Sequence, residues 1–241
     1  MLHAVVSDIH GNLEALEAVL EDLDRHHPAS IACLGDFVGY GASPNECIAM
    51  LRPRIEAAVI GNHDLAAIGR LRLRNFNSEA AAAARWTDAQ LTAESRQWLE
   101  SLPYVAPWHG ALLVHASPIR PEEWNYVLSP TDAEAEMAEC AETLVIVGHS
   151  HYPGTFEVTE GRAHYNREPE VHMRPGSRYL VNAGSVGQPR DGDPRAGYLL
   201  YDDRERLLRH VRLEYDIDGA MRRIREAGLP EVLASRLEWG E

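Results

Sequence analysis

Leu34-Gly35-Asp36-Phe37-Val38-Gly39-Tyr40-Gly41 follows a short apolar run, residues 31–34, that is typical of a buried strand. The glycines allow the backbone to turn sharply and to pass close to a ligand. Asp36 is therefore expected at the carboxyl end of a strand, where open α/β sheets bind their ligands. A Gly-Asp pair after one strand is more often an ordinary turn, so the interpretation depends on how the other strands end.

The composition favours one globular domain with an acidic surface. The 241 residues are 45% hydrophobic, which is enough for a sizeable core. The formal net charge is −14, and all 23 basic residues are arginine. Such acidity argues against binding of a long nucleic acid through counterion release. A small anionic substrate is still compatible with it, because bound divalent metal ions can reverse the local field.

The cysteines and the start of the chain indicate where the protein works. Cys33, Cys47 and Cys140 are odd in number and lack metal-ligand spacing, which is typical of reduced thiols in a cytosolic protein. Residues 1–6 lead directly into Ser7-Asp8, which fits no signal peptide, and no apolar run is long enough to span a bilayer. We therefore expect a cytoplasmic protein that does not bind membranes.

Strand-like and helix-like patterns alternate at the start of the chain. Strands are predicted over 2–6, 31–34 and 57–60, with helices that begin at Leu13 and at Pro44. This order is the signature of an α/β layered fold. Residues 65–101 carry a helical pattern and are predicted to be a helical insertion beside the sheet.

The second half of the chain changes from helices to strands. Strands are predicted over 110–114 and 144–147, with a helix over 131–141 between them. The later strands, which we expect to form a second, largely antiparallel sheet, cover 154–158, 162–165, 179–181, 197–201 and 207–214. Helices over 220–225 and 232–237 close the chain. With no repeat and no low-complexity linker, residues 1–241 are predicted to form a single domain.

Side chains that can bind a metal follow five of the predicted strands. Each has an ordinary structural explanation, such as a helix N-cap or a left-handed turn, but five such explanations would have to coincide. Oxygen and imidazole ligands without cysteine suit two divalent first-row ions, manganese, iron or zinc, with manganese or iron favoured. Asp36 has two oxygens and can bridge ions about 3.5–4 Å apart. The full set is Asp8, His10, Asp36, Asn62, His63, His115, His149 and His151.

These residues stand in a pattern that resembles a known family. The segments Asp8-x-His10, Gly35-Asp36-x-x-Gly39, Gly61-Asn62-His63-Asp64, His115 and Gly148-His149-x-His151 resemble the complete calcineurin-like metallophosphoesterase signature, in order. Residues 36–46 and 182–190 are similar to a branch of compact bacterial and archaeal enzymes that includes phosphodiesterases and diadenosine-tetraphosphate hydrolases. The resemblance implies a four-layer α/β/β/α sandwich with two mixed sheets.

The resemblance also implies how the metal ligands are shared. One ion would be bound by Asp8, His10, Asp36 and His151, and the other by Asp36, Asn62, His115 and His149. His63 matches the family's histidine that is not a ligand, and it is the candidate proton donor to the leaving oxygen. Asp64 follows it and is expected either to keep the His63 ring cationic, as a second catalytic residue, or to serve only as a turn residue.

Candidate substrate contacts are Asn62 and Arg190. Arg190 lies in the glycine-rich loop 184–192, and a guanidinium group matches phosphate oxygens well. Asp191 and Asp193 offer the alternative that Arg190 only clasps its own loop. Other side chains that could bind phosphate or stack on a base are Arg70, Arg72, Arg74, Arg120, Trp86, Trp98, Trp108, Trp124 and Tyr126.

The sequence therefore predicts a dinuclear metal-dependent phosphoesterase that hydrolyses a small phosphodiester or a nucleotide polyphosphate. A serine/threonine or tyrosine protein phosphatase is the alternative within this class. A non-catalytic binding scaffold on the same fold, as in the retromer subunit that resembles these enzymes, is the alternative of another class. A complete ligand set together with His63 favours the enzyme, because a scaffold has no need of an acid.

Overall fold

Two six-stranded mixed sheets lie face to face in the computed structural model, which describes residues 1–241. The first sheet has the spatial order β3 (Ala57–Ala58), β2 (Ile31–Cys33), β1 (Leu2–Val6), β11 (Ala196–Asp202), β12 (Leu207–Leu213) and β9 (Glu170–His172). The second has the order β4 (Val105–Trp108), β5 (Ala111–Val114), β6 (Leu144–Val147), β10 (Arg178–Asn182), β7 (Gly154–Thr159) and β8 (Arg162–Asn166).

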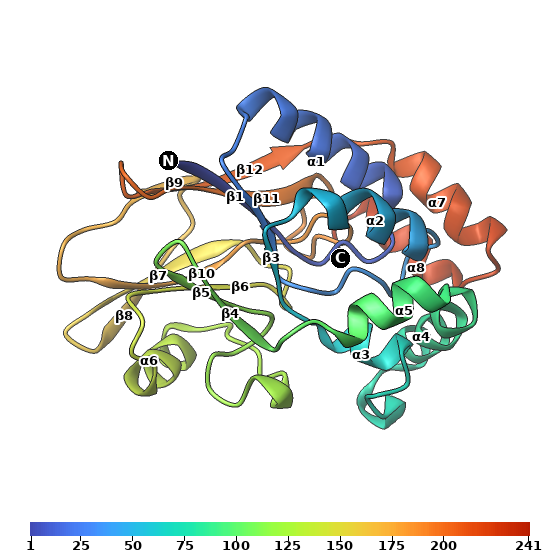
Figure 1. Cartoon of the computed structure of the whole chain (residues 1–241), viewed down its shortest axis with the longest axis horizontal. Coiled ribbons are helices and arrows are strands. Elements are labelled where there is room, and N and C mark those ends of the chain that lie inside the picture. The colour runs from blue at the N-terminus through green and yellow to red at the C-terminus, as the bar shows by residue number, and fades with distance from the viewer.

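Helices cover the outer faces of both sheets and complete the four layers. Helices α1 (Leu13–His26), α2 (Pro44–Leu51) and α7 (Ile217–Glu226) lie on the side of the first sheet, and α6 (Pro130–Glu139) lies on the side of the second (Figure 1). Alternate residues of β1 point to opposite faces, so Val6 packs against the helices while Val5 packs between the sheets. The α/β/β/α sandwich is therefore confirmed.

The remaining helices lie near the ends of the first sheet's strands. Helices α3 (Asn62–Ala67), α4 (Ser78–Gln90) and α5 (Ala93–Glu100) occupy the region that the helical pattern predicted, and α8 (Glu231–Ser235) lies near the carboxyl terminus. Single helical turns lie at η1 (Arg52–Arg54), η2 (Leu73–Asn75), η3 (Pro121–Glu123) and η4 (Arg236–Glu238). No helix is both long enough and apolar enough to cross a membrane.

The division of strands between the sheets differs from the sequence prediction. Strands β5 and β6, expected with β1, pair in parallel in the second sheet, and β6 is also parallel to β10. Strands β11 and β12 were expected apart from β1, but β1 pairs with β11 along the register Leu2↔Asp202. Alternating polarity predicts which side of a strand is buried, but it carries no information about which distant strand lies beside it.

Strands β4 and β9 were also missed. Strand β4 is half exposed and contains Pro107, and β9 has three residues, so neither carries a clear pattern.

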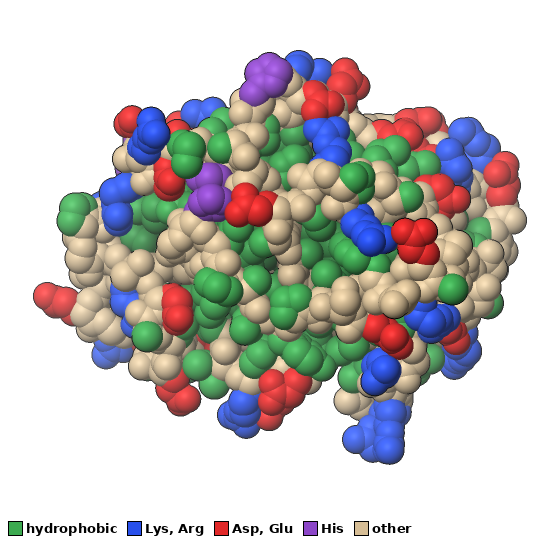
Figure 2. Space-filling view, in the orientation of Figure 1, with side chains coloured by type: hydrophobic (Ala, Val, Ile, Leu, Met, Phe, Trp, Pro, Cys, Tyr) green, Lys and Arg blue, Asp and Glu red, His purple; other side chains and the backbone are tan.

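Charged side chains of both signs are mixed on the surface. Figure 2 shows acidic and basic groups interspersed around the edge of one face, with no large field of a single sign there. The net charge of −14 is thus not gathered into one acidic patch on this face.

Candidate metal centre

Loops from both sheets meet at one place, where five strands end. In the first sheet, the loop after β1 carries Asp8 and His10, the loop after β2 carries Asp36, and Asn62 is the first residue of α3, which follows β3. In the second sheet, His115 follows β5, and His149 and His151 follow β6. Backbone hydrogen bonds fasten the loops together: the His10 N–H donates to the Asp36 carbonyl at 2.9 Å, and the Gly148 N–H to that of His115 at 2.8 Å. Strand ends distant in sequence therefore present their side chains to one another.

The candidate ligands form two adjacent groups. Ligand atoms of Asp8, His10 and His151 lie within 4.8 Å of one another, as do those of Asp36, His115 and His149, and all six residues are buried. Asp36 Oδ2 lies 3.6 Å from His10 Nε2 and 3.3 Å from His115 Nε2, so this oxygen stands between the two groups.

Several atoms at this centre have no hydrogen-bond partner despite being buried. They are Asp8 Oδ1, Asp36 Oδ2, Asn62 Oδ1 and His115 Nε2. A buried polar atom without a partner normally costs a few kcal/mol, and a carboxylate oxygen costs more. Four such atoms side by side have the donor chemistry that a divalent first-row cation requires. The residues present therefore fit bound metal ions.

Hydrogen bonds to backbone carbonyls orient the histidine rings. His10 Nδ1 lies 3.1 Å from the carbonyl oxygen of Val38, and His115 Nδ1 lies 2.7 Å from that of Leu34. His151 Nδ1 makes the same kind of bond to the carbonyl oxygen of Gln188. Since a carbonyl oxygen only accepts, each Nδ1 carries a proton, and Nε2 is the atom that offers a lone pair when the ring is neutral. This hydrogen bonding predetermines the tautomer that a metal ligand needs.

His149 has the opposite arrangement. Its Nε2 lies 3.0 Å from the carbonyl oxygen of Trp124, which leaves Nδ1 as the atom with the lone pair. Tyr126 stacks on the His149 ring with centroids 4.1 Å apart. The loop between β5 and α6 therefore fixes the orientation of this ring.

The backbone is strained where it presents ligands. Asp8, His10, Asp36, His149 and His151 all have positive φ angles, between 50° and 64°. This left-handed conformation is unfavourable for residues with a Cβ and clusters at functional sites. Close packing adds to the constraint, because a Cβ on Gly61 would overlap the Asp36 carboxylate (a glycine is required there).

Burial and mutual charge set the protonation of the rings. Burial lowers the pKa of His10, His149 and His151, to about 3 for His149, so these rings are neutral and can donate a lone pair. Burial also opposes a charged ring at His115, but the Asp36 carboxylate raises its pKa to about 9. Against the effect of burial, His115 in turn holds the pKa of Asp36 well below its usual range. A cation that binds His115 Nε2 must therefore displace a proton.

Asp64 lies beside the centre, but not where a partner of His63 would be. Its carboxylate accepts hydrogen bonds from the backbone N–H groups of Asp36 at 2.8 Å, Gly61 at 3.0 Å and Val38 at 3.2 Å. His63 Nδ1 has no hydrogen-bond partner. This geometry favours the second alternative given for Asp64, a structural residue: the carboxylate holds the Asp36 loop against the start of α3. The sequence could not show this, because it gives adjacency along the chain and not the direction of each side chain.

His63 faces aromatic neighbours beside the metal ligands. Its ring lies 4.4 Å from Tyr40, 4.9 Å from His10 and 5.0 Å from Phe76, measured between centroids. Burial, together with the Arg190 charge, lowers its pKa to about 4 despite the opposing effect of Asp36. The ring is therefore neutral near pH 7 in the free protein.

A cavity of about 340 Å³ opens next to the two groups. Asn62, His63 and His149 line its inner end, and Arg72, Arg190, Trp124 and Tyr126 from the predicted substrate contacts line it too. The other predicted contacts lie elsewhere, namely Arg70, Arg74, Arg120, Trp86, Trp98 and Trp108. Trp98, for example, packs edge-on against Phe37 at 4.9 Å, and Arg120 binds Glu123 at 3.0 Å.

Arg190 does not pair with the acidic residues of its own loop. Asp191 binds Arg212, and Asp193 binds Arg195 with a shortest distance of 2.6 Å. Arg190 Nη2 instead donates to the Gln188 side-chain oxygen at 2.8 Å and to the Tyr40 hydroxyl at 3.3 Å. The guanidinium therefore has no carboxylate partner at the edge of the cavity.

Tyr40 and Arg236 are the cavity residues of most interest among those that the sequence did not single out; the others are Leu71, Asn75, Phe76, Asn77, Ala80 and Glu123. Tyr40 has a φ of 62° and lies in the loop that carries Asp36, so its position in that motif was the available signal. No signal pointed to Arg236, because the carboxyl-terminal segment reaches the site only through the tertiary fold.

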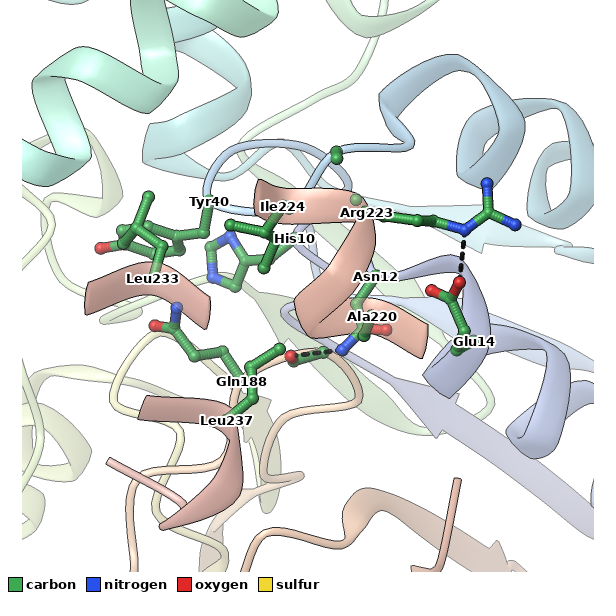
Figure 3. Close-up of a pocket in the computed structure, with 14 residues that line it drawn as sticks. His10, Asn12, Glu14, Tyr40, Gln188, Ala220, Arg223, Ile224, Leu233 and Leu237 are labelled. Atoms are coloured by element: carbon green, nitrogen blue, oxygen red, sulfur yellow. Dashed lines mark hydrogen bonds and ion pairs between the residues drawn. The ribbon is translucent and has the colours of Figure 1, made fainter. Parts of the chain in front are cut away.

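A second and much smaller cavity lies behind His10. It measures about 10 Å³, which is about the space of one water molecule. Figure 3 shows Leu233 and Leu237 from the carboxyl-terminal segment on the same cavity as His10, Tyr40 and Gln188. The carboxyl terminus therefore packs directly on the loops of the metal centre.

Comparison with known proteins gives consistent similarities. Residues 1–206 match the family model of the calcineurin-like phosphoesterase superfamily domain. An uncharacterized protein of Methanocaldococcus jannaschii is 40% identical over an alignment that covers 98% of this chain and 97% of that protein.

Solved structures extend the comparison. The crystal structure of a metallophosphoesterase from Sphaerobacter thermophilus is also 40% identical, with a TM-score of 0.88, and covers 100% of this chain and 99% of that one. A hypothetical protein from Pyrococcus horikoshii OT3, 22% identical, has the same fold with a TM-score of 0.81, over 100% of this chain and 98% of that one.

Proposed function

This chain belongs to the calcineurin-like phosphoesterase superfamily and is a phosphoester hydrolase, and from that premise we propose that it uses two divalent metal ions to hydrolyse a small phosphodiester or a nucleotide polyphosphate. The observation that carries the proposal is the set of buried, unpartnered ligand atoms at the inner end of a cavity edged by arginines.

The ligand assignment follows the two groups of side chains. Asp8, His10 and His151 would hold one ion, Asn62, His115 and His149 the other, and Asp36 would serve both. Manganese or iron is the proposed metal, in line with oxygen and imidazole donors and no thiolate. Such ions supply charge neutralisation for a phosphoryl group and a lowered pKa for a coordinated water.

The chain's own side chains supply the remaining steps. Arg190 would hold phosphoryl oxygens that point into the cavity, since a guanidinium can donate two parallel hydrogen bonds. His63 would give a proton to the leaving oxygen. Its low pKa in the free protein does not oppose this role, because a phosphate bound beside the ring is an opposite charge that favours the protonated form.

A small substrate is proposed over a phosphoprotein because the cavity is limited in size. Its volume of about 340 Å³ suits a nucleotide-sized ligand. A scaffold function is not proposed, since it would give no reason for strained backbone at five ligands. Cytoplasmic location is also proposed, supported by three buried cysteines that form no disulfide.

A substrate panel tests the proposed function. Protein freed of metal with a chelator is assayed with and without added Mn²⁺, Fe²⁺ or Zn²⁺ on phosphomonoesters, phosphodiesters, dinucleoside polyphosphates and phosphopeptides. The proposal expects metal-dependent hydrolysis of the diesters or polyphosphates. Hydrolysis of phosphopeptides alone would contradict it.

Arg190→Ala is predicted to weaken substrate binding without damaging the metal centre. One charge-assisted hydrogen-bonding group is worth about 1.5–3 kcal/mol, so kcat/KM should fall roughly 10–100-fold. Metal content and Tm should not change, because Arg190 contacts only Gln188 and Tyr40. Steady-state kinetics, elemental analysis and thermal melting are the measurements.

Arg195→Ala is the matched control. It removes an arginine five positions further on that binds Asp193 and does not line the cavity. If Arg190→Ala melted earlier and hydrolysed substrate normally, Arg190 would be a structural residue of its loop.

A further inference from the structure

We infer that the carboxyl-terminal segment, residues 231–241, completes the substrate cavity by supplying Arg236, and that Arg190 and Arg236 together bind a second phosphate group beyond the one held at the metal centre. This inference rests on the proposed function and narrows it, because it selects substrates with linked phosphates, such as nucleotide polyphosphates, over esters with a single phosphate.

The first support is unbalanced positive charge. Arg190 and Arg236 both line the cavity, and neither has an acidic side chain within ion-pair distance. Burial and, to a lesser extent, the charge of Arg190 lower the pKa of Arg236, while Tyr40 and Glu241 act in the opposite direction. Glu123 is the one acidic side chain that lines the cavity, and it binds Arg120 at 3.0 Å. Arg190 and Arg236 are therefore left without a side-chain carboxylate there, which favours an anionic ligand.

The second support is that the fold fixes Arg236 in place. Leu233 and Leu237 are buried in one apolar cluster with Tyr40 and residues of α4 and α7. Figure 3 shows these two leucines against the loops that carry Tyr40 and Gln188. Arg236 lies between these two leucines in the chain, and its Nε donates to the backbone oxygen of Glu241. A side chain fixed at both ends loses less entropy when it binds a ligand.

The third support is a direct connection between the segment and the loop of Arg190. The Gly192 N–H donates to the Gly240 carbonyl oxygen at 3.0 Å. Gly240 has a φ of 66°, and a Cβ there would overlap the backbone of Asp193. The backbone at Gly240 is therefore fitted closely to the loop, and the two arginines are held by parts of the chain that are joined to each other.

The placement of the two arginines indicates what the ligand must be. Arg190 donates to the Tyr40 hydroxyl at 3.3 Å, and the Tyr40 ring lies 4.6 Å from the ring of His10, so Arg190 lies near the metal ligands. Arg236 lines the same cavity from the carboxyl-terminal segment. A single phosphate at the metal centre would leave Arg236 without a partner, whereas a linked second phosphate would reach it.

Binding of a matched ligand pair tests the inference. Isothermal titration, at saturating Mn²⁺, compares AMP with the non-hydrolysable α,β-methylene analogue of ADP, which carries one more phosphate group. We expect the wild-type protein to bind the analogue roughly 10–100-fold more tightly than AMP, because one charge-assisted hydrogen bond raises the affinity by about this factor. Arg236→Ala should reduce that ratio to about threefold or less. Arg222→Ala, which removes an exposed arginine of α7, should leave the ratio unchanged.

The outcomes separate this inference from the proposed function. An unchanged ratio in Arg236→Ala, or equal binding of both ligands by the wild type, would overturn the inference. Metal-dependent hydrolysis of bis(p-nitrophenyl) phosphate by the wild-type protein reports on the proposed function by itself, because this substrate has one phosphate. Thermal melting of Arg236→Ala shows whether it is folded; should it be unfolded, Arg236→Gln, which keeps most of the side chain, must show the same loss of the ratio.

Discussion

Asp36→Asn is expected to lower metal binding in both groups of ligands and to reduce kcat/KM by about 10³-fold or more. Asp36 Oδ2 lies within 3.6 Å of a ligand nitrogen of each group, so one neutralised oxygen affects both sites. The metal ions are expected to supply several kcal/mol of transition-state stabilisation, and each 1.36 kcal/mol is worth tenfold in rate. Elemental analysis of the purified variant and steady-state kinetics are the measurements.

The control for Asp36→Asn is Asp24→Asn, which neutralises an exposed carboxylate that binds Arg54 far from the centre. It should keep the metal content and the activity of the wild type. Two full equivalents of metal in Asp36→Asn would count strongly against a shared carboxylate.

His63→Gln is expected to slow hydrolysis about 10²–10⁴-fold for substrates with poor leaving groups. Aryl phosphates with good leaving groups hardly need a proton and should be affected much less. Metal content should not change, because the hydrogen bond from His63 to Asp36 Oδ1, 2.8 Å long, is donated by the backbone N–H. This group is still present in the variant.

A series of aryl and alkyl phosphodiesters of graded leaving-group pKa measures the effect. A steeper dependence of log kcat/KM on leaving-group pKa in His63→Gln is the expected result. Equal losses for good and poor leaving groups would remove His63 as the proton donor and leave it a role in binding.

Much of the centre could be predicted because it lies at strand ends. The apolar runs before Asp8, Asp36 and His115 are short and continuous, so the sequence indicates where each strand ends. Parallel strands bring their carboxyl ends to one edge, which accounts for the grouping within β1 to β3 and within β5 and β6. This rule does not predict that the two sheets bring these edges together.

What could not be predicted depends on partners that are distant in sequence. Strand β11 lies beside β1, and Arg236 lines a cavity with His63, although nothing in either local pattern requires it. The direction of the Asp64 carboxylate is a similar case, since its three hydrogen bonds are to backbone groups that any sequence could offer. The local pattern of apolar residues indicates which face of an element is buried, but which distant element packs against it depends on the whole fold.

Anomalous diffraction from crystals grown with Mn²⁺ tests the central claim most directly. The account predicts two manganese peaks about 3.5–4 Å apart on either side of Asp36 Oδ2, one among Asp8, His10 and His151 and the other among Asn62, His115 and His149. A single peak, or peaks away from these ligands at saturating Mn²⁺, would contradict it.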